Sequence, residues 1–216
     1  MSIFRLKSAA LAAALLASGV SAQAVTLLSE DFASVATLAG SGWVLTNASS
    51  PVGSTGWFQG DSTIFAAQSG AAESYAAANY NNAASGGIVS NWLITPTFST
   101  ATEVVISFWA KGINEPGYFD VIGWGLSTGS SAIGSFDIQS ATILPASWTK
   151  YTVHLDAQGA GTVARFAISY GGFAAAADYI GVDTLTVTAV PEPANWLMLG
   201  AGVLGLAVRR RLGADR

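Results

Sequence analysis

The stretch Glu103–Ala110, "EVVISFWA", decides the fold class, because its apolar positions alternate with a second set of side chains. Successive side chains of an extended chain point to opposite faces, so Val104, Ile106 and Phe108 share one face. The intervening residues on the other face are Val105, Ser107 and Trp109. A period of two is the pattern of a half-buried β-strand.

The same alternation recurs in "WTKYTVHL" (Trp148–Leu155) and "VARFAISY" (Val163–Tyr170). Clusters of Gly, Pro, Asn and Ser separate these runs, and no segment of residues 25–189 has a sustained helical period. We predict an all-β, two-sheet, jelly-roll-like sandwich. The other expected strands are Thr26–Phe32, Trp43–Thr46, Ser74–Tyr80, Ser90–Ile94, Tyr118–Ser127, Ile133–Ile138 and Tyr179–Thr188. Strand plus loop is also expected for the alanine-rich pieces, Ala71–Ala84 and Ala174–Ala177.

Charge within residues 25–189 is strongly acidic. This segment contains eleven Asp or Glu and three Lys or Arg side chains, which gives a net charge of −8 when His154 is counted as neutral. Affinity for nucleic acid rests on neutralising phosphates, so this balance excludes nucleic acid as a partner. The chain has no cysteine, and a domain of this size buries enough surface to fold without disulfides.

The N-terminus has the three parts of a secretory signal peptide. A basic start precedes a run of alanine and leucine, and the small residues Ala22 and Ala24 form the site that a signal peptidase reads. We expect residues 1–24 to be a signal peptide, with the mature domain over residues 25–189. The protein is therefore expected to be exported.

The C-terminal residues 190–216 combine a proline pair, an apolar run and an arginine-rich tail. Residues 194–208 carry no charge, and a helix of that length spans about 22 Å, against about 30 Å of hydrocarbon in a bilayer. We expect a short transmembrane helix there, with the arginines on the cytoplasmic side. The flanking residues are Pro191, Glu192 and Pro193 on one side and Arg209, Arg210 and Arg211 on the other.

This order of parts resembles the PEP-CTERM sorting signal of Gram-negative bacteria. The resemblance implies that an exosortase recognises Pro191, Glu192 and Pro193 and removes the tail there. The protein would pass through an inner-membrane intermediate to the cell surface or the extracellular matrix. A short helix would suffice, because it only presents the motif at the membrane boundary. A permanent single-pass anchor is the alternative.

Stretches of the body resemble the choice-of-anchor J domain, a relative of the cleaved-adhesin and MAM-like jelly-roll modules. The resemblance covers nearly all of Leu28–Thr188 and implies a module without established enzymatic activity. In the middle, "YFDVIGWGLS" carries Asp120 but lacks an arginine that family members often have. The stretches that carry the resemblance are Gly56–Asn82, Gly86–Pro96 with "WLITP", the Phe-Trp strand and Asp178–Val187.

The aromatic residues suggest two roles. Tyr118, Asp120 and Trp124 share one face of an expected strand beside a glycine-containing loop. These three are our candidates for an exposed platform on which a sugar stacks. Four other large rings are expected to fill the gap between the sheets: Trp57, Phe58, Trp92 and Trp109.

Three acidic residues form a candidate calcium site. Glu30 and Asp31 lie in the first expected strand and Asp183 in the last, and jelly rolls commonly bring these strands together. A buried carboxylate must be paired or bound to metal, and calcium takes carboxylate oxygens. The residues in phase with Asp183, expected in the core, are Tyr179, Leu185 and Val187. The alternative is a hydrogen-bonded or solvent-facing aspartate where the strand phase slips.

One catalytic pattern occurs in the body of the sequence. Gly125–Gly129 matches G-x-S-x-G around Ser127, and Asp137 and His154 follow in the order of α/β-hydrolases. That motif requires a strand-to-helix elbow, and no helix is expected within residues 25–189 to supply one. The absence of cysteine and the single histidine exclude zinc and thiol chemistry. We therefore expect that the protein is not an enzyme.

The sequence thus predicts an exported, non-enzymatic protein of the cell surface or extracellular matrix. Signal peptidase and exosortase are its expected processing partners, and exopolysaccharide is its leading ligand class. The alternative is a membrane-anchored, calcium-stabilised adhesion module with a protein partner.

Overall fold

The computed structural model describes residues 23–190 apart from residue 114. Ala22, the expected transmembrane helix over residues 194–208 and its flanking prolines and arginines lie outside these residues. Within the described residues, no helix has the length and apolar character needed to cross a membrane.

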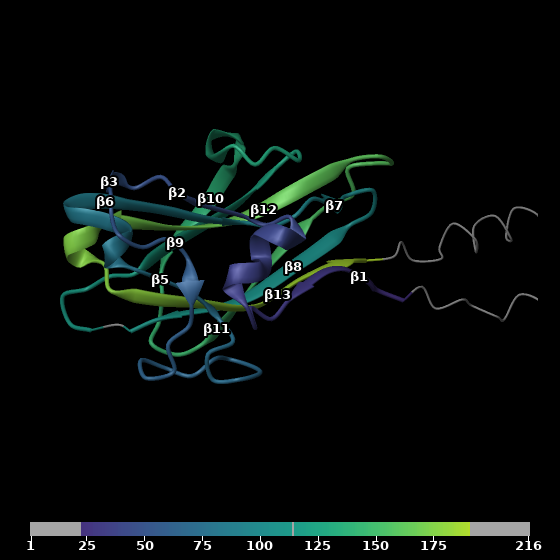
Figure 1. Cartoon of the computed structure of the whole chain (residues 1–216). Helices are drawn as coiled ribbons and strands as arrows, with labels where there is room; N and C mark the ends of the chain where they lie inside the picture. The colour runs from purple at the N-terminus through teal and green to yellow at the C-terminus, as the bar shows by residue number, and fades with distance from the viewer. Residues whose placement is uncertain (1–22, 114, 191–216) are drawn as a thin grey trace, which may run out of the picture. The chain divides into compact units, whose positions relative to one another are not determined.

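Two antiparallel sheets face each other, which confirms the predicted all-β sandwich (Figure 1). In the first sheet the strand order is β11-β8-β13-β5-β4, with β1 also paired to β13. Its strands are β1 (Val25–Glu30), β4 (Phe58–Gln59), β5 (Ala76–Asn79), β8 (Val104–Gly112), β11 (Thr149–Leu155) and β13 (Tyr179–Ala189).

In the second sheet the order is β10-β9-β12-β6-β2, and two short strands pair off this path, β3 with β6 and β7 with β12. Its strands are β2 (Val44–Asn47), β3 (Ser50–Val52), β6 (Ala83–Ile94), β7 (Phe98–Ser99), β9 (Val121–Ser127), β10 (Asp137–Ile143) and β12 (Val163–Phe173). Within residues 23–190, four 3₁₀ turns connect strands: η1 (Val35–Ser41), η2 (Tyr80–Asn82), η3 (Ile133–Ser135) and η4 (Ala174–Ala176).

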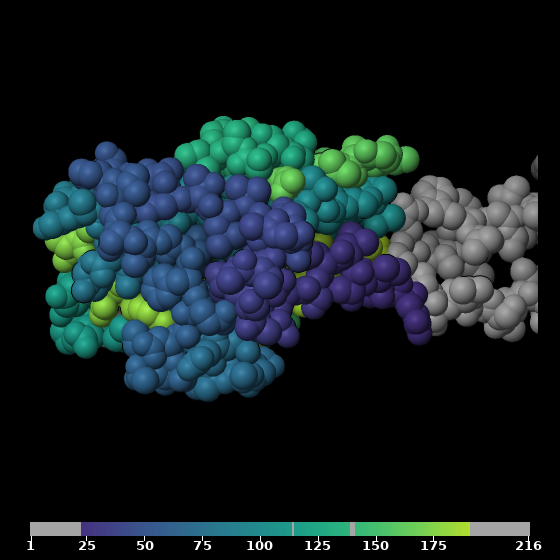
Figure 2. Space-filling view, viewed as in Figure 1, coloured from purple at the N-terminus to yellow at the C-terminus, as the bar shows by residue number. Residues whose placement is uncertain are grey.

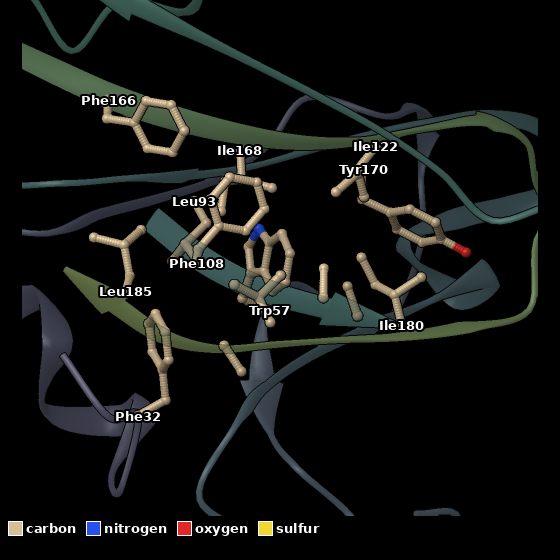
Figure 3. Close-up of a cluster of buried hydrophobic side chains, with 14 of the residues drawn as sticks. Phe32, Trp57, Leu93, Phe108, Ile122, Phe166, Ile168, Tyr170, Ile180 and Leu185 are labelled. Atoms are coloured by element: carbon tan, nitrogen blue, oxygen red, sulfur yellow. The ribbon is translucent and has the colours of Figure 1, made fainter. Parts of the chain in front are cut away.

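The core lies between the sheets and follows the predicted alternation. Val104, Ile106 and Phe108 of β8 are fully buried. The facing sheet contributes Phe166 and Ile168 of β12, and Figure 3 shows side chains from both sheets meeting in one layer. Burial of these branched and aromatic side chains is the main favourable term for folding.

A bulge in β13 changes which face its residues occupy. The pairing with β8 shifts register between Asp183 and Thr186, and Thr184 takes a φ of 47°. An extra residue in one strand moves every later side chain to the other face. Asp183 therefore does not share the core face of Leu185, and the stated alternative, a hydrogen-bonded aspartate where the strand phase slips, is the one observed.

Residues before and after this bulge occupy the faces that the register shift gives them. Ile180 and Val182 before it and Leu185 and Val187 after it lie in the main core. Tyr179, which was also expected in phase with Leu185, packs instead in a separate cluster with Tyr75. Asp183 itself is fully buried, but on the outer face of the first sheet.

Only one of the four rings expected between the sheets lies in the main core, and that ring is Trp57. Phe58 packs in the cluster of Tyr75 and Tyr179. Trp92 packs against Phe136 on the outer side of the second sheet, with ring centroids 6.0 Å apart. Trp109 is half-buried and alternates with the core residues of β8. The prediction failed for these rings because each lies on the strand face that points away from the gap.

Several element boundaries also differ from expectation. The expected strand Ile133–Ile138 is the turn η3 followed by β10, which begins only at Asp137. Strand β6 begins at Ala83 and runs through Gly86 and Gly87, well before the expected start at Ser90. The alanine-rich segment before η2 forms β5, as predicted, and Ala174–Ala176 forms the turn η4.

A loop that we call the strap, residues 61–74, covers the outer face of the first sheet. Its Phe65 stacks on Tyr75, with ring centroids 5.0 Å apart. The indole Nε1 of Trp148 donates a hydrogen bond of 2.9 Å to the carbonyl of Ala66. The carboxylate of Asp183 accepts from the backbone N–H groups of the strap at Gln68 and Ser69, at 2.8 and 3.0 Å. The strap is thus fastened to β13 by a buried charge.

Candidate functional site

The candidate site is a groove at the end of the sandwich opposite Val25 and Ala189, on the left in Figure 1. Two adjoining pockets of about 360 Å³ and 210 Å³ form it, and both are lined by Tyr80, Ala174 and Ala175. We call this the distal groove. The larger pocket is completed by Glu115, Tyr118, Ala177 and Asp178, and the smaller by Asn81, Ala83, Ser85 and Gly86. In Figure 2 the left end is made of differently coloured segments, which are far apart in sequence.

Aromatic side chains are unusually exposed around the distal groove. Tyr80 is 47% and Tyr118 40% exposed, and both line the groove. Phe119 and Phe173 directly flank its lining residues in the chain and are 55% and 70% exposed. Large exposed apolar side chains that gather on one surface indicate an interaction site.

A tight turn presents Tyr118. The backbone N–H of Tyr118 donates a 3.0 Å hydrogen bond to the carbonyl of Glu115, and Gly117 between them has a φ of 92°. Proline at the second position and glycine at the third are the residues that a type II turn requires. The turn is joined to η4, because Phe119 N–H donates to the Ala176 carbonyl at 2.6 Å.

Tyr80 is positioned from two sides. The side-chain oxygen of Asn79 accepts from the Asn81 N–H at 3.1 Å and from the Thr55 hydroxyl at 3.0 Å, which caps the turn η2. The backbone N–H of Tyr80 donates to the Asp178 carbonyl at 2.9 Å. The Tyr80 ring and the Asp178 carboxylate are thus carried by neighbouring segments of one wall of the distal groove.

Asp120 supports the groove from below. Its carboxylate, only 4% exposed, accepts from the Tyr170 hydroxyl at 2.7 Å and from the Asp178 N–H at 2.8 Å. Burial raises the pKa of Asp120, while the hydrogen bond from Tyr170 opposes that shift. Burial, followed by the nearby charge of Asp120, raises the pKa of Tyr170 well above its usual range. This buried pair fixes the start of the segment that carries Asp178.

The open side of the larger pocket is acidic. Burial raises the pKa of Asp178, and the charges of Asp120 and Glu115 raise it further. Like charges placed close together disfavour ionisation of each other. The pocket therefore combines two tyrosine rings with a negative electrostatic potential.

The three residues predicted to form a sugar platform have three different positions. Tyr118 lines the distal groove and Asp120 lies beneath it. Trp124 faces the other way, into the sandwich, where its ring lies 5.6 Å from that of Phe108 and 5.2 Å from that of Tyr151. The three side chains therefore do not form one exposed platform, and their ligand-binding role stays a prediction.

Sequence reasoning missed Tyr80, Glu115 and Asp178 as groove residues. Tyr80 follows an alanine-rich segment that carries no binding pattern. The one available signal was "EPGY", residues 115–118, whose turn residues mark an exposed loop with an aromatic side chain at its end.

The candidate calcium residues each have a partner within the chain. Glu30 accepts from the Phe32 N–H at 2.9 Å, and Asp31 from the Ala33 N–H at 3.1 Å. Asp183 accepts from the strap and, at 3.1 Å, from the Thr184 hydroxyl. Across the described part of the chain, no three acidic or histidine side chains gather where they could hold a metal ion. Structural calcium stays a prediction.

The hydrolase pattern does not assemble into a triad. Ser127 and Asp137 both line a pocket of about 620 Å³ near the end of the sandwich opposite the distal groove. The Ser127 hydroxyl donates to the Ser130 carbonyl. His154 is exposed on the outer face of β11, and its Nδ1 lies 3.8 Å from the Glu103 carboxylate. The His154 imidazole therefore does not lie where it could act as a base on the Ser127 hydroxyl.

Two comparisons with known proteins match this chain. Residues 189–211 match the PEP-CTERM protein-sorting motif, a range that includes Pro191, Glu192, Pro193 and the arginines 209–211. The described domain is similar in structure to cleaved adhesin domains of Lys-gingipain from Porphyromonas gingivalis W83. No match was found among curated protein sequences.

The structural similarity covers the whole of each adhesin domain. The K1 domain superposes with a TM-score of 0.58 at 17% identity, covering 79% of this chain and 100% of the adhesin chain. The K3 domain superposes with a TM-score of 0.56 at 17% identity, covering 77% and 99%. At 17% identity, this similarity shows the fold of the domain alone.

The described residues thus form an adhesin-like β-sandwich with an aromatic and acidic groove at one end. The PEP-CTERM protein-sorting motif matched at residues 189–211 indicates an exported chain that an exosortase sorts to the cell surface.

Proposed function

We propose that the protein is a non-enzymatic binding module of the extracellular matrix that holds a carbohydrate polymer in the distal groove. The signal peptide over residues 1–24, cleavage after Ala24 and removal of the tail near Pro191–Pro193 belong to this proposal. They would deliver residues 25–189 as a free domain in the exopolysaccharide of a Gram-negative bacterium. A choice-of-anchor J identity also stays a prediction.

The observation that carries the proposal is the continuous groove with exposed rings. Binding sites combine apolar and aromatic surface with a few placed polar groups that fix orientation. Tyr80 and Tyr118 offer faces on which the apolar side of a sugar ring stacks, and Asn81, Ser85 and Asp178 offer donors and acceptors for hydroxyls. Two pockets that share Tyr80 suit successive units of one linear polymer better than a single small molecule.

The test is retention of the exported protein, purified from its host and identified by intact mass, in native gels containing host exopolysaccharide. Replacing Tyr80→Ala together with Tyr118→Ala should weaken binding about tenfold or more, because each stacked ring contributes about 1 kcal/mol. The pair Tyr80→Phe and Tyr118→Phe keeps the rings and should retain most of the binding.

Val163→Ala is the control for a shortened exposed side chain near the opposite end, and it should leave retention unchanged. Circular dichroism melts show whether each variant is folded. If the double alanine variant is folded and retained like the parent protein, the distal groove is not the polymer site.

A further inference from the structure

The larger pocket of the distal groove has the chemistry of a site for an organic cation. Its lining residues include two tyrosines and two acids, Glu115 and Asp178, and contain no lysine, arginine or histidine. An ammonium group is attracted to the face of an aromatic ring, and nearby carboxylates add direct Coulomb attraction.

A third carboxylate strengthens the negative potential from behind. Asp120 accepts the backbone N–H of Asp178 at 2.8 Å, so its charge lies directly under the pocket wall. Burial is the main cause of the raised pKa of Asp178, and the charges of Asp120 and Glu115 raise it further. In a partly desolvated pocket these charges interact more strongly than they would in water.

The basic residues of the described domain are engaged or placed elsewhere. The Arg165 guanidinium donates to carbonyls of Gly129, Gly42 and Thr95. The Lys111 ammonium lies 4.2 Å from the centre of the Phe65 ring, under the strap. Lys150 lies on β11, at the far edge of the first sheet. None of the three lines the pocket.

We propose that this pocket receives the ammonium group of an amino sugar, so that the polymer bound in the groove carries free amines. This inference rests on the proposed function and specifies its ligand. A polymer of uronic acids would meet like charge in the groove, and an N-acetylated sugar would bring no charge to match the two carboxylates. A partly or fully deacetylated amino-sugar polymer satisfies the rings and the acids together.

The test compares oligomers of glucosamine with matched, fully N-acetylated oligomers of the same length, by calorimetry on the exported protein at about pH 6. We expect the glucosamine oligomer to bind about tenfold more tightly or better. Asp178→Asn with Glu115→Gln should abolish that preference. Asp156→Asn, which removes an exposed carboxylate away from the groove, is the matched control and should preserve it.

A second probe is tetramethylammonium alone, followed by the NMR signals of the Tyr80 and Tyr118 rings. Shifts of both rings that disappear in the Asp178→Asn, Glu115→Gln variant support the cation site even if no oligomer binds, in which case the polymer proposal fails. The cation site is overturned if both oligomers bind with equal affinity, if the Asp178→Asn, Glu115→Gln variant keeps that affinity, and if neither ring signal shifts. The polymer proposal then still stands. Tighter binding of the N-acetylated oligomer also overturns the cation site.

Discussion

At the scale of single residues, Gly181 shows how closely the outer cluster packs on the sheet. A Cβ atom at this position would lie 2.8 Å from both Trp148 and Tyr75 and 2.9 Å from Phe65. The residue pairs with Ala77 and Lys111 across β13, so its backbone cannot move away without breaking the ladder. Its small size is therefore a packing requirement of the cluster under the strap.

We expect Gly181→Ala to lower the free energy of unfolding by about 1–3 kcal/mol, the usual effect of overpacking. Chemical denaturation measures the change. Gly40→Ala is the control, because a Cβ there meets no atom within 4 Å. Equal stability of the two variants would mean that the ring cluster rearranges freely, contrary to the packing argument.

At the scale of elements, the strap and β13 depend on one another. The bulge at Thr184 turns Asp183 to the outer face, where its carboxylate accepts two N–H groups of the strap. Phe65 and Trp148 add ring packing at the other end of the same loop. A local irregularity in one strand is thus the anchor point of a long loop.

We expect Asp183→Asn to loosen the strap while the sandwich stays folded. Gln68 and Ser69 both donate to one carboxylate oxygen, Oδ2. The amide of Asn keeps one acceptor oxygen for them but carries no charge, so part of the about 1.5–3 kcal/mol of each charged hydrogen bond is lost. Hydrogen exchange by mass spectrometry should show faster exchange over residues 66–70. The same region in Asp156→Asn should exchange at the parent rate. Unchanged protection in Asp183→Asn would show that the aromatic contacts alone hold the strap.

At the scale of the whole molecule, acidic groups dominate both charge and pH response. Burial is the leading cause of a raised pKa at Glu30, Asp120, Asp178 and Asp183. An acid with a raised pKa binds its proton more tightly in the folded state, so its contribution to stability is full below the ordinary pKa and is lost as pH rises through the raised one. The exposed Asp61 acts in the opposite direction, because hydrogen bonds from Thr63 lower its pKa.

We therefore expect these four groups to lower the melting temperature as pH rises from about 4 toward neutrality. Acidification also protonates carboxylates and so reduces the net charge of −8. The weaker repulsion between like charges adds to the stability at lower pH. Differential scanning calorimetry across this range measures the effect. Asp183→Asn should flatten the pH dependence, whereas Asp156→Asn should not. A melting temperature that falls on acidification would contradict the assignment of these buried carboxyl groups.

Much of the architecture could be predicted from sequence. The alternation in β8 predicted that Val104, Ile106 and Phe108 share one face, and that face lies in the core. Tyr118 was identified as a candidate for exposed binding, and it lines the groove. Periodicity could not distinguish Trp124 from Tyr118, because both share a phase in the expected strand, whereas β9 begins only at Val121 and leaves Tyr118 in the preceding turn.

By itself, the sequence determined the fold class, the acidic character of the domain and the sorting motif. These depend on local pattern: a period of two along each strand, a count of charges, and the order of a proline pair, an apolar run and arginines. Only the tertiary structure decided where Asp183 points and which residues form the groove. A one-residue bulge reverses a face without leaving a signal in composition. The groove is assembled from Tyr80, Tyr118 and Asp178, which are distant in the chain and meet only because β5, β9 and β13 begin or end at the same edge of the sandwich.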